Sequence, residues 1–123
     1  MDRLETREAS IFAVVTRVKV KPGKLDECAA LFRATNASLI ELEHDWVNAL
    51  FLADRANSVA TIVAIWRSVD SYNSFIRGNR FSEVMQQVGR YFDGEPETSV
   101  NEVLVDMSWP AGAGASNIAI GPE

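Results

Sequence analysis

The stretch Ser58–Phe92 places the strongest constraint on the fold. Within it, Val59–Trp66 is rich in β-branched residues and carries no charge, which is typical of a buried central strand. Ser68 can cap a helix, and apolar residues recur after it at helical spacing as far as Gly78. A second helix is predicted from a cap at Asn79. Because a strand runs directly into two helices, the helices must fold back over the sheet, and this stretch would line any pocket between them. The apolar stripe of the second helix is predicted to consist of Phe81, Val84, Met85, Val88 and Phe92.

Four further elements complete the predicted order. They are a strand over residues 11–20, a helix over 25–43, a strand over 45–53 and a strand over 98–109. The resulting order, β-α-β-β-α(α)-β, predicts an α+β, ferredoxin-like fold with a four-stranded antiparallel sheet. We therefore divide the chain into a polar leader (1–10), one domain (11–109) and a Gly/Ala-rich tail (110–123).

Composition argues against several kinds of partner and site. A formal net charge of −5 offers no basic stripe for nucleic acid or an anionic membrane. The apolar, uncharged run at residues 58–66 is far shorter than the roughly 20 residues of a membrane helix. A single cysteine, Cys28, excludes an internal disulfide and fits a reducing cytoplasm. With one histidine beside it, the chain has too few ligands to favour a zinc site.

The sheet is predicted to be apolar on the face turned away from its helices as well. An exposed apolar face that large is unusual for a monomer. We therefore predict a homodimer that packs sheet against sheet. The residues predicted on this outer face are Val15, Leu50, Leu52, Val63, Ile65 and Leu104.

Asn36 is a polar residue near the centre of the apolar stripe of the 25–43 helix. A buried amide without a partner costs about 1–3 kcal/mol. Two interpretations stay open: the side chain bonds a nearby backbone group, or it points into a ligand cavity.

Two motifs carry a resemblance to a known family. They are VKVKPGK (Val18–Lys24) and IWRSVDSYNSFIRGNRF (Ile65–Phe81). With their order and spacing, the chain resembles the antibiotic biosynthesis monooxygenase domain of the dimeric α/β-barrel superfamily over about residues 11–107. One departure is Glu43–Trp46, which stands where the family has Pro-Gly before its second strand. The resemblance implies that two copies together form a dimeric α/β barrel.

Haem-degrading relatives use an asparagine, a tryptophan and a histidine that this chain lacks. The corresponding positions hold Thr16, Phe75 and Met85. The resemblance therefore implies no haem chemistry, and we expect no cofactor and no metal.

Cofactor-free polyketide oxygenases of the same family match the chain more closely. Their tryptophan at the end of the third strand matches Trp66, and their tyrosine six residues later matches Tyr72. Their pocket tyrosine and asparagine fall at Phe51 and Ile62, which makes this pocket more apolar. Trp66 and Tyr72 are therefore the predicted catalytic residues. The predicted substrate-binding residues are Thr16, Asn36, Phe51, Phe75 and Met85.

Oxygen chemistry without a metal or flavin needs a substrate anion that can itself reduce dioxygen, together with hydrogen-bond donors and a dry cavity. The sequence thus predicts a cofactor-independent monooxygenase acting on a small aromatic, polyketide or quinone-like compound. Two alternatives stay open: a binding or isomerase-like protein of the same fold, and a structural or regulatory dimer whose pocket is filled by side chains. Oxygen consumption separates the first two functions, and cavity volume separates both from the third.

Overall fold

The computed structural model describes residues 11–107. The predicted leader (1–10) and tail (110–123) lie outside the described residues and stay predictions. Within the described part, no helix combines the length and the apolar character needed to cross a membrane. The elements are β1 (Phe12–Lys19), α2 (Leu25–Leu42), β2 (Trp46–Asp54), β3 (Val59–Trp66), α3 (Val69–Ile76), α4 (Asn79–Val88), the 3-10 helix η1 (Gly89–Tyr91) and β4 (Glu97–Glu102).

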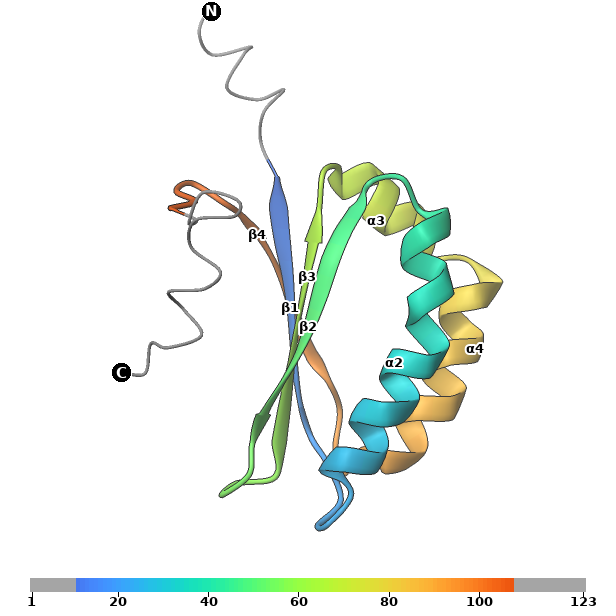
Figure 1. Ribbon diagram of the computed structural model, residues 1–123, viewed down its shortest axis with the longest axis vertical. Coiled ribbons are helices and arrows are strands. Elements are labelled where there is room, and N and C mark those ends of the chain that lie inside the picture. Colours follow the sequence, from blue (N-terminus) through green and yellow to red (C-terminus); the bar gives the residue numbers. More distant parts are fainter. Residues whose placement is uncertain (1–10, 108–123) are drawn as a thin grey trace, which may run out of the picture.

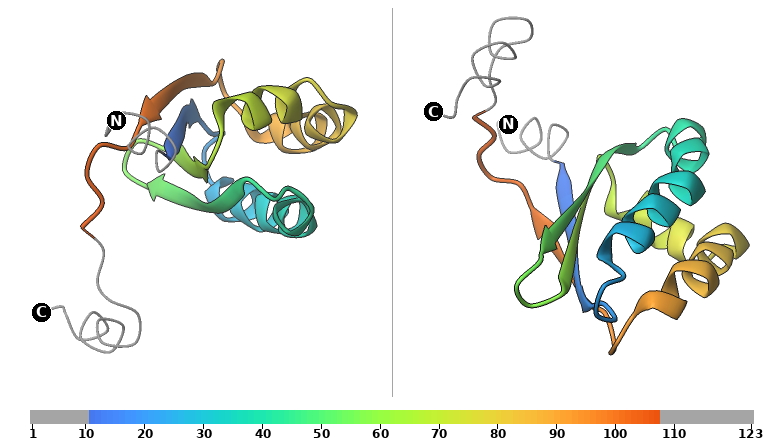
Figure 2. Two further views of the ribbon diagram at one scale, coloured as in Figure 1. Left: turned by 90° about the horizontal axis from the view of Figure 1, so that it is seen from above. Right: turned by 60° about the horizontal axis from the view of Figure 1, so that its bottom comes forward.

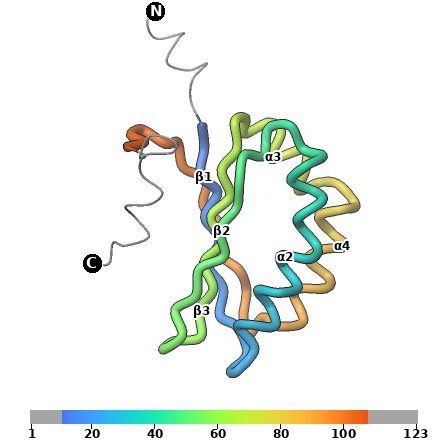
Figure 3. The backbone as a smooth tube through the Cα atoms, in the orientation of Figure 1, coloured from blue at the N-terminus to red at the C-terminus, as the bar shows by residue number. Residues whose placement is uncertain are grey.

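The strands form one antiparallel sheet in the order β2-β3-β1-β4 (Figure 1). The three helices lie on one face of this sheet, and the end-on view in Figure 2 shows the two layers. Figure 3 shows α2 and α4 side by side along the same face. The predicted ferredoxin-like α+β fold is confirmed.

The core between the two layers is divided into two clusters. One contains Val14, Leu39, Trp46, Ala64 and Trp66, and the other contains Val18, Val20, Leu25, Cys28 and Ala60. In the strand register, Val14 pairs with Ala64 and Val18 pairs with Ala60. The pair between them, Thr16 and Ile62, belongs to neither cluster. The middle of the helix-facing side is therefore less tightly filled than its two ends.

The first helix of the central stretch begins as predicted, whereas the second does not. The hydroxyl of Ser68 accepts a hydrogen bond from the backbone N–H of Ser71 (3.1 Å), so Ser68 is the N-cap of α3. The predicted cap at Asn79 is wrong, because Asn79 is already helical and Gly78 is the N-cap of α4. Gly78 has extended backbone and makes no side-chain capping bond.

The prediction that Phe92 belongs to the stripe of α4 is also wrong. The helix ends at Val88, η1 follows, and Phe92 is extended and forms a β-bridge with Val20. Two backbone bonds explain this departure: Lys21 N–H to the carbonyl of Tyr91 (2.8 Å), and Asp93 N–H to that of Lys19 (2.7 Å). They draw the chain onto the end of β1 before a further helical turn can form.

Strand β4 is shorter than predicted, because it ends at Glu102 instead of continuing to residue 109. Glu102 pairs with Phe12, the first residue of β1, and one further bond joins Val103 N–H to the carbonyl of Ile11 (2.9 Å). Beyond this point β1 offers no partner. Leu104, predicted on the outer sheet face, therefore lies past the strand and is exposed. Residues 108 and 109 lie outside the described part.

Candidate functional site

A cavity of about 480 Å³ lies between the sheet and its helices. This volume is within the range of small-molecule sites, about 300–1,000 Å³. Six of the seven predicted site residues line it: Thr16, Asn36, Trp66, Tyr72, Phe75 and Met85. The cavity argues against a protein whose pocket is filled by its own side chains. The roles of these residues stay predictions.

The structure does not place Phe51 in the wall of this cavity. Phe51 lines a separate groove of about 600 Å³ between α2 and β2. Phe32 lines both hollows, and its ring centroid lies 5.5 Å from that of Phe51. Although Phe51 pairs with cavity residue Ile62 in the strand register, α2 passes over β2 and interposes Phe32.

Replacing Phe32 with alanine is expected to join the cavity and the groove. A ligand with one more fused ring should then bind more tightly relative to a shorter one, while the free energy of unfolding falls by about 3 kcal/mol. Ligand titration by tryptophan fluorescence measures this preference, since Trp46 and Trp66 line the cavity. Phe51→Ala is the matched control, because it enlarges the groove alone; equal preferences in the two variants would contradict the prediction.

Aromatic rings close the end of the cavity near α3. Trp66 is 1% exposed and stacks on Trp46, with 5.2 Å between ring centroids and 11° between planes. Tyr72 meets Trp66 edge-on at 5.6 Å, and Phe75 contacts both tryptophans. Trp46 was not among the predicted site residues. The sequence could have indicated Trp46, because a hairpin of β2 and β3 brings a large aromatic residue at the start of β2 beside Trp66 at the end of β3.

The two tryptophans differ in hydrogen bonding. Trp46 Nε1 donates to the carbonyl of Asn48 (3.1 Å), whereas the buried Trp66 Nε1 has no partner among the described residues. Buried polar groups are normally paired, and an unpaired one costs about 1–3 kcal/mol. A ligand oxygen that accepted a hydrogen bond from the Trp66 indole N–H would remove this cost.

Asn36 combines both of the interpretations that its sequence position left open. Its Nδ2 donates to the backbone carbonyl of Phe32 (2.9 Å) and to Thr35 Oγ1 (3.1 Å), so the bond to a nearby backbone group is confirmed. The residue is buried and also lines the cavity. Because the amide nitrogen is already engaged within α2, Asn36 offers a ligand its carbonyl oxygen.

Tyr72 is a hydrogen-bond donor and a poor base in this setting. Burial raises the pKa of its phenol, because a phenolate would lose solvation. Four positions along β1 from the residue that pairs with Trp66, the hydroxyl oxygens of Thr16 and Thr98 lie 3.0 Å apart across β1 and β4. The cavity wall therefore presents weak neutral donors and acceptors, with Tyr72 at the aromatic end and the two threonines further along.

Helix α3, which carries Tyr72, is tied to the start of β2. Ser71 Oγ donates to Asp45 Oδ2 (2.5 Å), and Arg67 N–H donates to the carbonyl of Asp45 (2.8 Å). These bonds lie at Glu43–Trp46, where the sequence departs from the family's Pro-Gly before the second strand. The strand begins at Trp46, with a register shift before Asn48. Asp45 thus helps to position both the aromatic end and α3.

Glu95 lines the cavity and was missed by the sequence analysis. It is the only carboxyl-bearing residue in the described cavity wall. In the sequence Glu95 stands between Gly94 and Pro96, and a glycine and a proline at this spacing indicate the end of a helix. That pattern gives no reason to expect a binding role for the residue between them. The signal that could have found it is an acid in the short loop that leads into the fourth strand.

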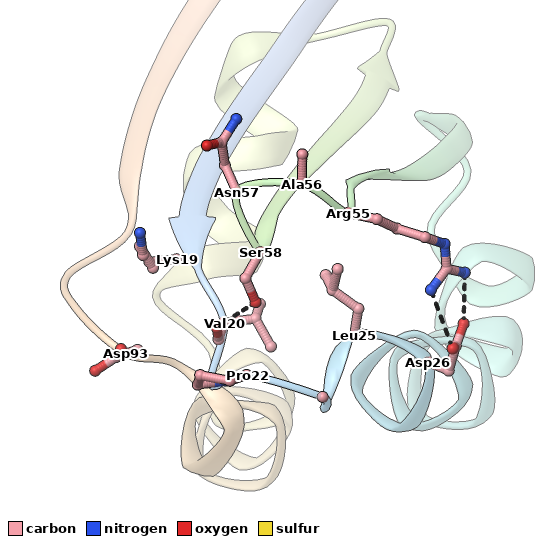
Figure 4. Close-up of a pocket in the computed structure, with 11 residues that line it drawn as sticks. Lys19, Val20, Pro22, Leu25, Asp26, Arg55, Ala56, Asn57, Ser58 and Asp93 are labelled. Atoms are coloured by element: carbon pink, nitrogen blue, oxygen red, sulfur yellow. Dashed lines mark hydrogen bonds and ion pairs between the residues drawn. The ribbon is translucent and has the colours of Figure 1, made fainter.

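A third hollow, of about 500 Å³, lies where β1 ends (Figure 4). Arg55 makes a two-pronged ion pair with Asp26, at 3.2 and 2.8 Å, which holds the pKa of that carboxyl below its usual value. Both side chains are exposed, and such pairs contribute little. No group of His, Cys, Asp and Glu that could hold a metal ion is found within residues 11–107. The apolar cavity is therefore the stronger candidate.

Models of known protein families give no match to the sequence, and neither do the curated proteins. Solved structures do match. One named an antibiotic biosynthesis monooxygenase, from Bordetella bronchiseptica, has a TM-score of 0.70 at 18% identity, covering 78% of this chain and 99% of its own. Another with that name, from Caulobacter crescentus, has a TM-score of 0.69 at 16% identity, covering 85% and 100%. This chain has the fold of the antibiotic biosynthesis monooxygenases.

A third structure with the antibiotic biosynthesis monooxygenase fold is SnoaB from Streptomyces nogalater, named a cofactor-independent oxygenase. Its TM-score is 0.67 at 16% identity, over 80% of this chain and 98% of its own. The predicted resemblance is thus confirmed for the fold. In this fold Trp66 lies at the end of β3 and Tyr72 lies on α3, and both line the cavity, while the roles that the resemblance implied for them stay predictions.

Proposed function

We propose that the protein is a cofactor-independent monooxygenase acting on a small aromatic, polyketide or quinone-like compound. The observation that supports this most is the buried, unpaired N–H of Trp66, a residue that lines an apolar cavity. Stacked tryptophans offer a flat ligand a large apolar surface, and the free indole N–H offers its oxygen a donor. SnoaB, named a cofactor-independent oxygenase, has the same fold.

The proposed chemistry begins when a hydroxylated aromatic ligand loses a proton. The resulting anion passes electrons to dioxygen, one oxygen atom enters a ring CH₂ group as a carbonyl, and the other leaves as water with the two hydrogens. Trp66 and Tyr72 stabilise the negative oxygen by hydrogen bonding, which is effective at the aromatic end of the cavity, where Trp66 is shielded from water. A binding or isomerase-like protein is the alternative, favoured because burial raises the pKa of Tyr72 and so keeps its phenol protonated and unable to act as a base.

Oxygen consumption tests the proposal. Purified protein without added metal or flavin should consume oxygen with a hydroxyanthrone or a hydroquinone. Tyr72→Phe should slow turnover about tenfold, because it removes one hydroxyl and keeps the ring. Tyr91→Phe is the matched control, since Tyr91 packs on the core cluster at the other end of β1. The binding-protein alternative predicts tight ligand binding with no oxygen uptake above the protein-free rate.

Trp66→Phe should weaken both ligand binding and turnover, because it removes the unpaired donor. Trp46→Phe is its control: the indole N–H of Trp46 already bonds Asn48, so its loss removes no donor from the ligand. If the two variants lose affinity equally, the free N–H of Trp66 plays no part in binding.

We also propose that the protein works as a homodimer in the cytoplasm. Leu50 and Leu52, on the outer sheet face, are 55% and 45% exposed. Val63 pairs with both Val15 and Leu50 in the strand register, so these three side chains form one apolar row across the sheet. A second copy packed on this row would cover it. The single cysteine, Cys28, supports a reducing location.

A further inference from the structure

We propose that Glu95 accepts the hydrogen bond, and then the proton, of a hydroxyl group at one end of an elongated, fused-ring ligand. The inference rests on the proposed function and names the substrate class and the missing base. Of the described residues that line the cavity, only Glu95 and Tyr72 can titrate. Burial raises the pKa of the Tyr72 phenol, so Tyr72 stays protonated and cannot take up the ligand's proton. Among the described residues of the cavity wall, Glu95 alone carries a carboxylate.

The backbone holds Glu95 between two fixed points. On one side, Asp93 N–H donates to the carbonyl of Lys19 (2.7 Å); on the other, Glu97 pairs with Arg17 in the sheet. Gly94 has a φ of 147°, a conformation that other residues rarely adopt. The proline that follows Glu95 restricts it to extended backbone. The carboxylate therefore belongs to a short loop whose backbone is constrained at both ends.

The position of Glu95 relative to Trp66 sets the length of the ligand. Trp66 pairs with Phe12 at one end of β1, and Glu97 pairs with Arg17 five positions further along. At about 3.3 Å per residue these pairs lie about 17 Å apart. Trp66 and Glu95 therefore belong to opposite ends of the cavity wall, and a ligand that contacts both residues must be elongated. Three or four fused rings, with an oxygen acceptor at one end and a hydroxyl at the other, meet this requirement.

The proton transfer has a complete path. In the enol tautomer of the ligand, one hydrogen of the CH₂ group has moved to the carbonyl oxygen and the carbon belongs to the aromatic system. The ligand O–H bond then breaks, Glu95 takes the proton, and the electron pair spreads from oxygen through the fused rings to that carbon, which reacts with dioxygen. Glu95 is exposed, so water can then take up the proton. Conjugation explains how a base at one end of the cavity can activate a carbon near Trp66 at the other.

Binding of non-oxidisable probes tests the inference apart from catalysis. 2-Hydroxy-6-methoxyanthraquinone and 2,6-dimethoxyanthraquinone both carry an oxygen acceptor at one end of three fused rings, and they differ at the other end in a single hydrogen-bond donor. The unmodified protein should bind the hydroxy probe about tenfold more tightly, because the bond to a carboxylate is charge-assisted. Glu95→Gln should reduce this preference to about twofold and leave dimethoxy-probe affinity unchanged. Glu97→Gln is the control, with the same charge change outside the cavity wall.

Turnover tests the proton transfer itself. With a hydroxyanthrone, Glu95→Gln should lower kcat about 100-fold with little change in KM, whereas Glu97→Gln should leave both unchanged. A Glu95-dependent hydroxyl preference without oxygen uptake would support Glu95 as the recognition group and refute the monooxygenase proposal alone. An unmodified protein with no hydroxyl preference, or a Glu95→Gln variant that retains it, would overturn the inference even if oxygen is consumed.

Discussion

Replacing Trp66 with alanine is expected to lower the free energy of unfolding by about 3–5 kcal/mol, the usual cost of deleting a buried tryptophan side chain. Trp66 is 1% exposed and touches Trp46, Tyr72 and Phe75, so its loss would open the core at the end of β3. Urea unfolding followed by circular dichroism measures the change. Because this damage is structural, the alanine variant is unsuited to testing catalysis.

A pair of conservative variants separates packing from hydrogen bonding at this site. Trp66→Phe should cost less than Trp46→Phe, although Trp66 is the more deeply buried of the two. The reason is that Trp46 Nε1 bonds the carbonyl of Asn48, and a bond of this kind is worth about 1 kcal/mol, whereas Trp66 Nε1 bonds nothing within the described residues. A larger loss for Trp66→Phe would show that its indole N–H is paired in the folded protein.

Replacing Val63 with aspartate is expected to abolish the proposed dimer. Val63 lies between Val15 and Leu50 on the outer face, and a carboxylate there would be buried without a partner if two sheets packed together. Light scattering should show a dimer for the unmodified protein. The variant should be monomeric, or unfolded if the monomer is not stable alone.

The control places the same residue on a surface away from the sheet. Gln86 is exposed on α4, and Gln86→Asp should leave the dimer intact. A folded, monodisperse monomer for the unmodified protein would contradict the homodimer, and the exposed leucines of β2 would then need another explanation.

The sequence determined the order of the elements because the relevant signals are local. The uncharged β-branched run predicted the strand β3 with its observed bounds, Val59–Trp66, and the capping hydroxyl of Ser68 predicted where α3 begins. The two aromatic residues that bracket this turn, Trp66 and Tyr72, could be expected beside one cavity, because a strand that feeds a helix must keep both near the same end of the sheet.

The tertiary structure decided which side chains share the cavity wall. Periodicity gives the face on which a residue lies and does not give what covers that face. Phe51 lies on the predicted face of β2, yet Phe32 of α2 stands between it and the cavity. Glu95 shows no periodicity, and it reaches the cavity because pairing at Asp93 and Glu97 fixes the loop between them against β1. Both positions depend on contacts between segments far apart in the chain, which no local pattern records.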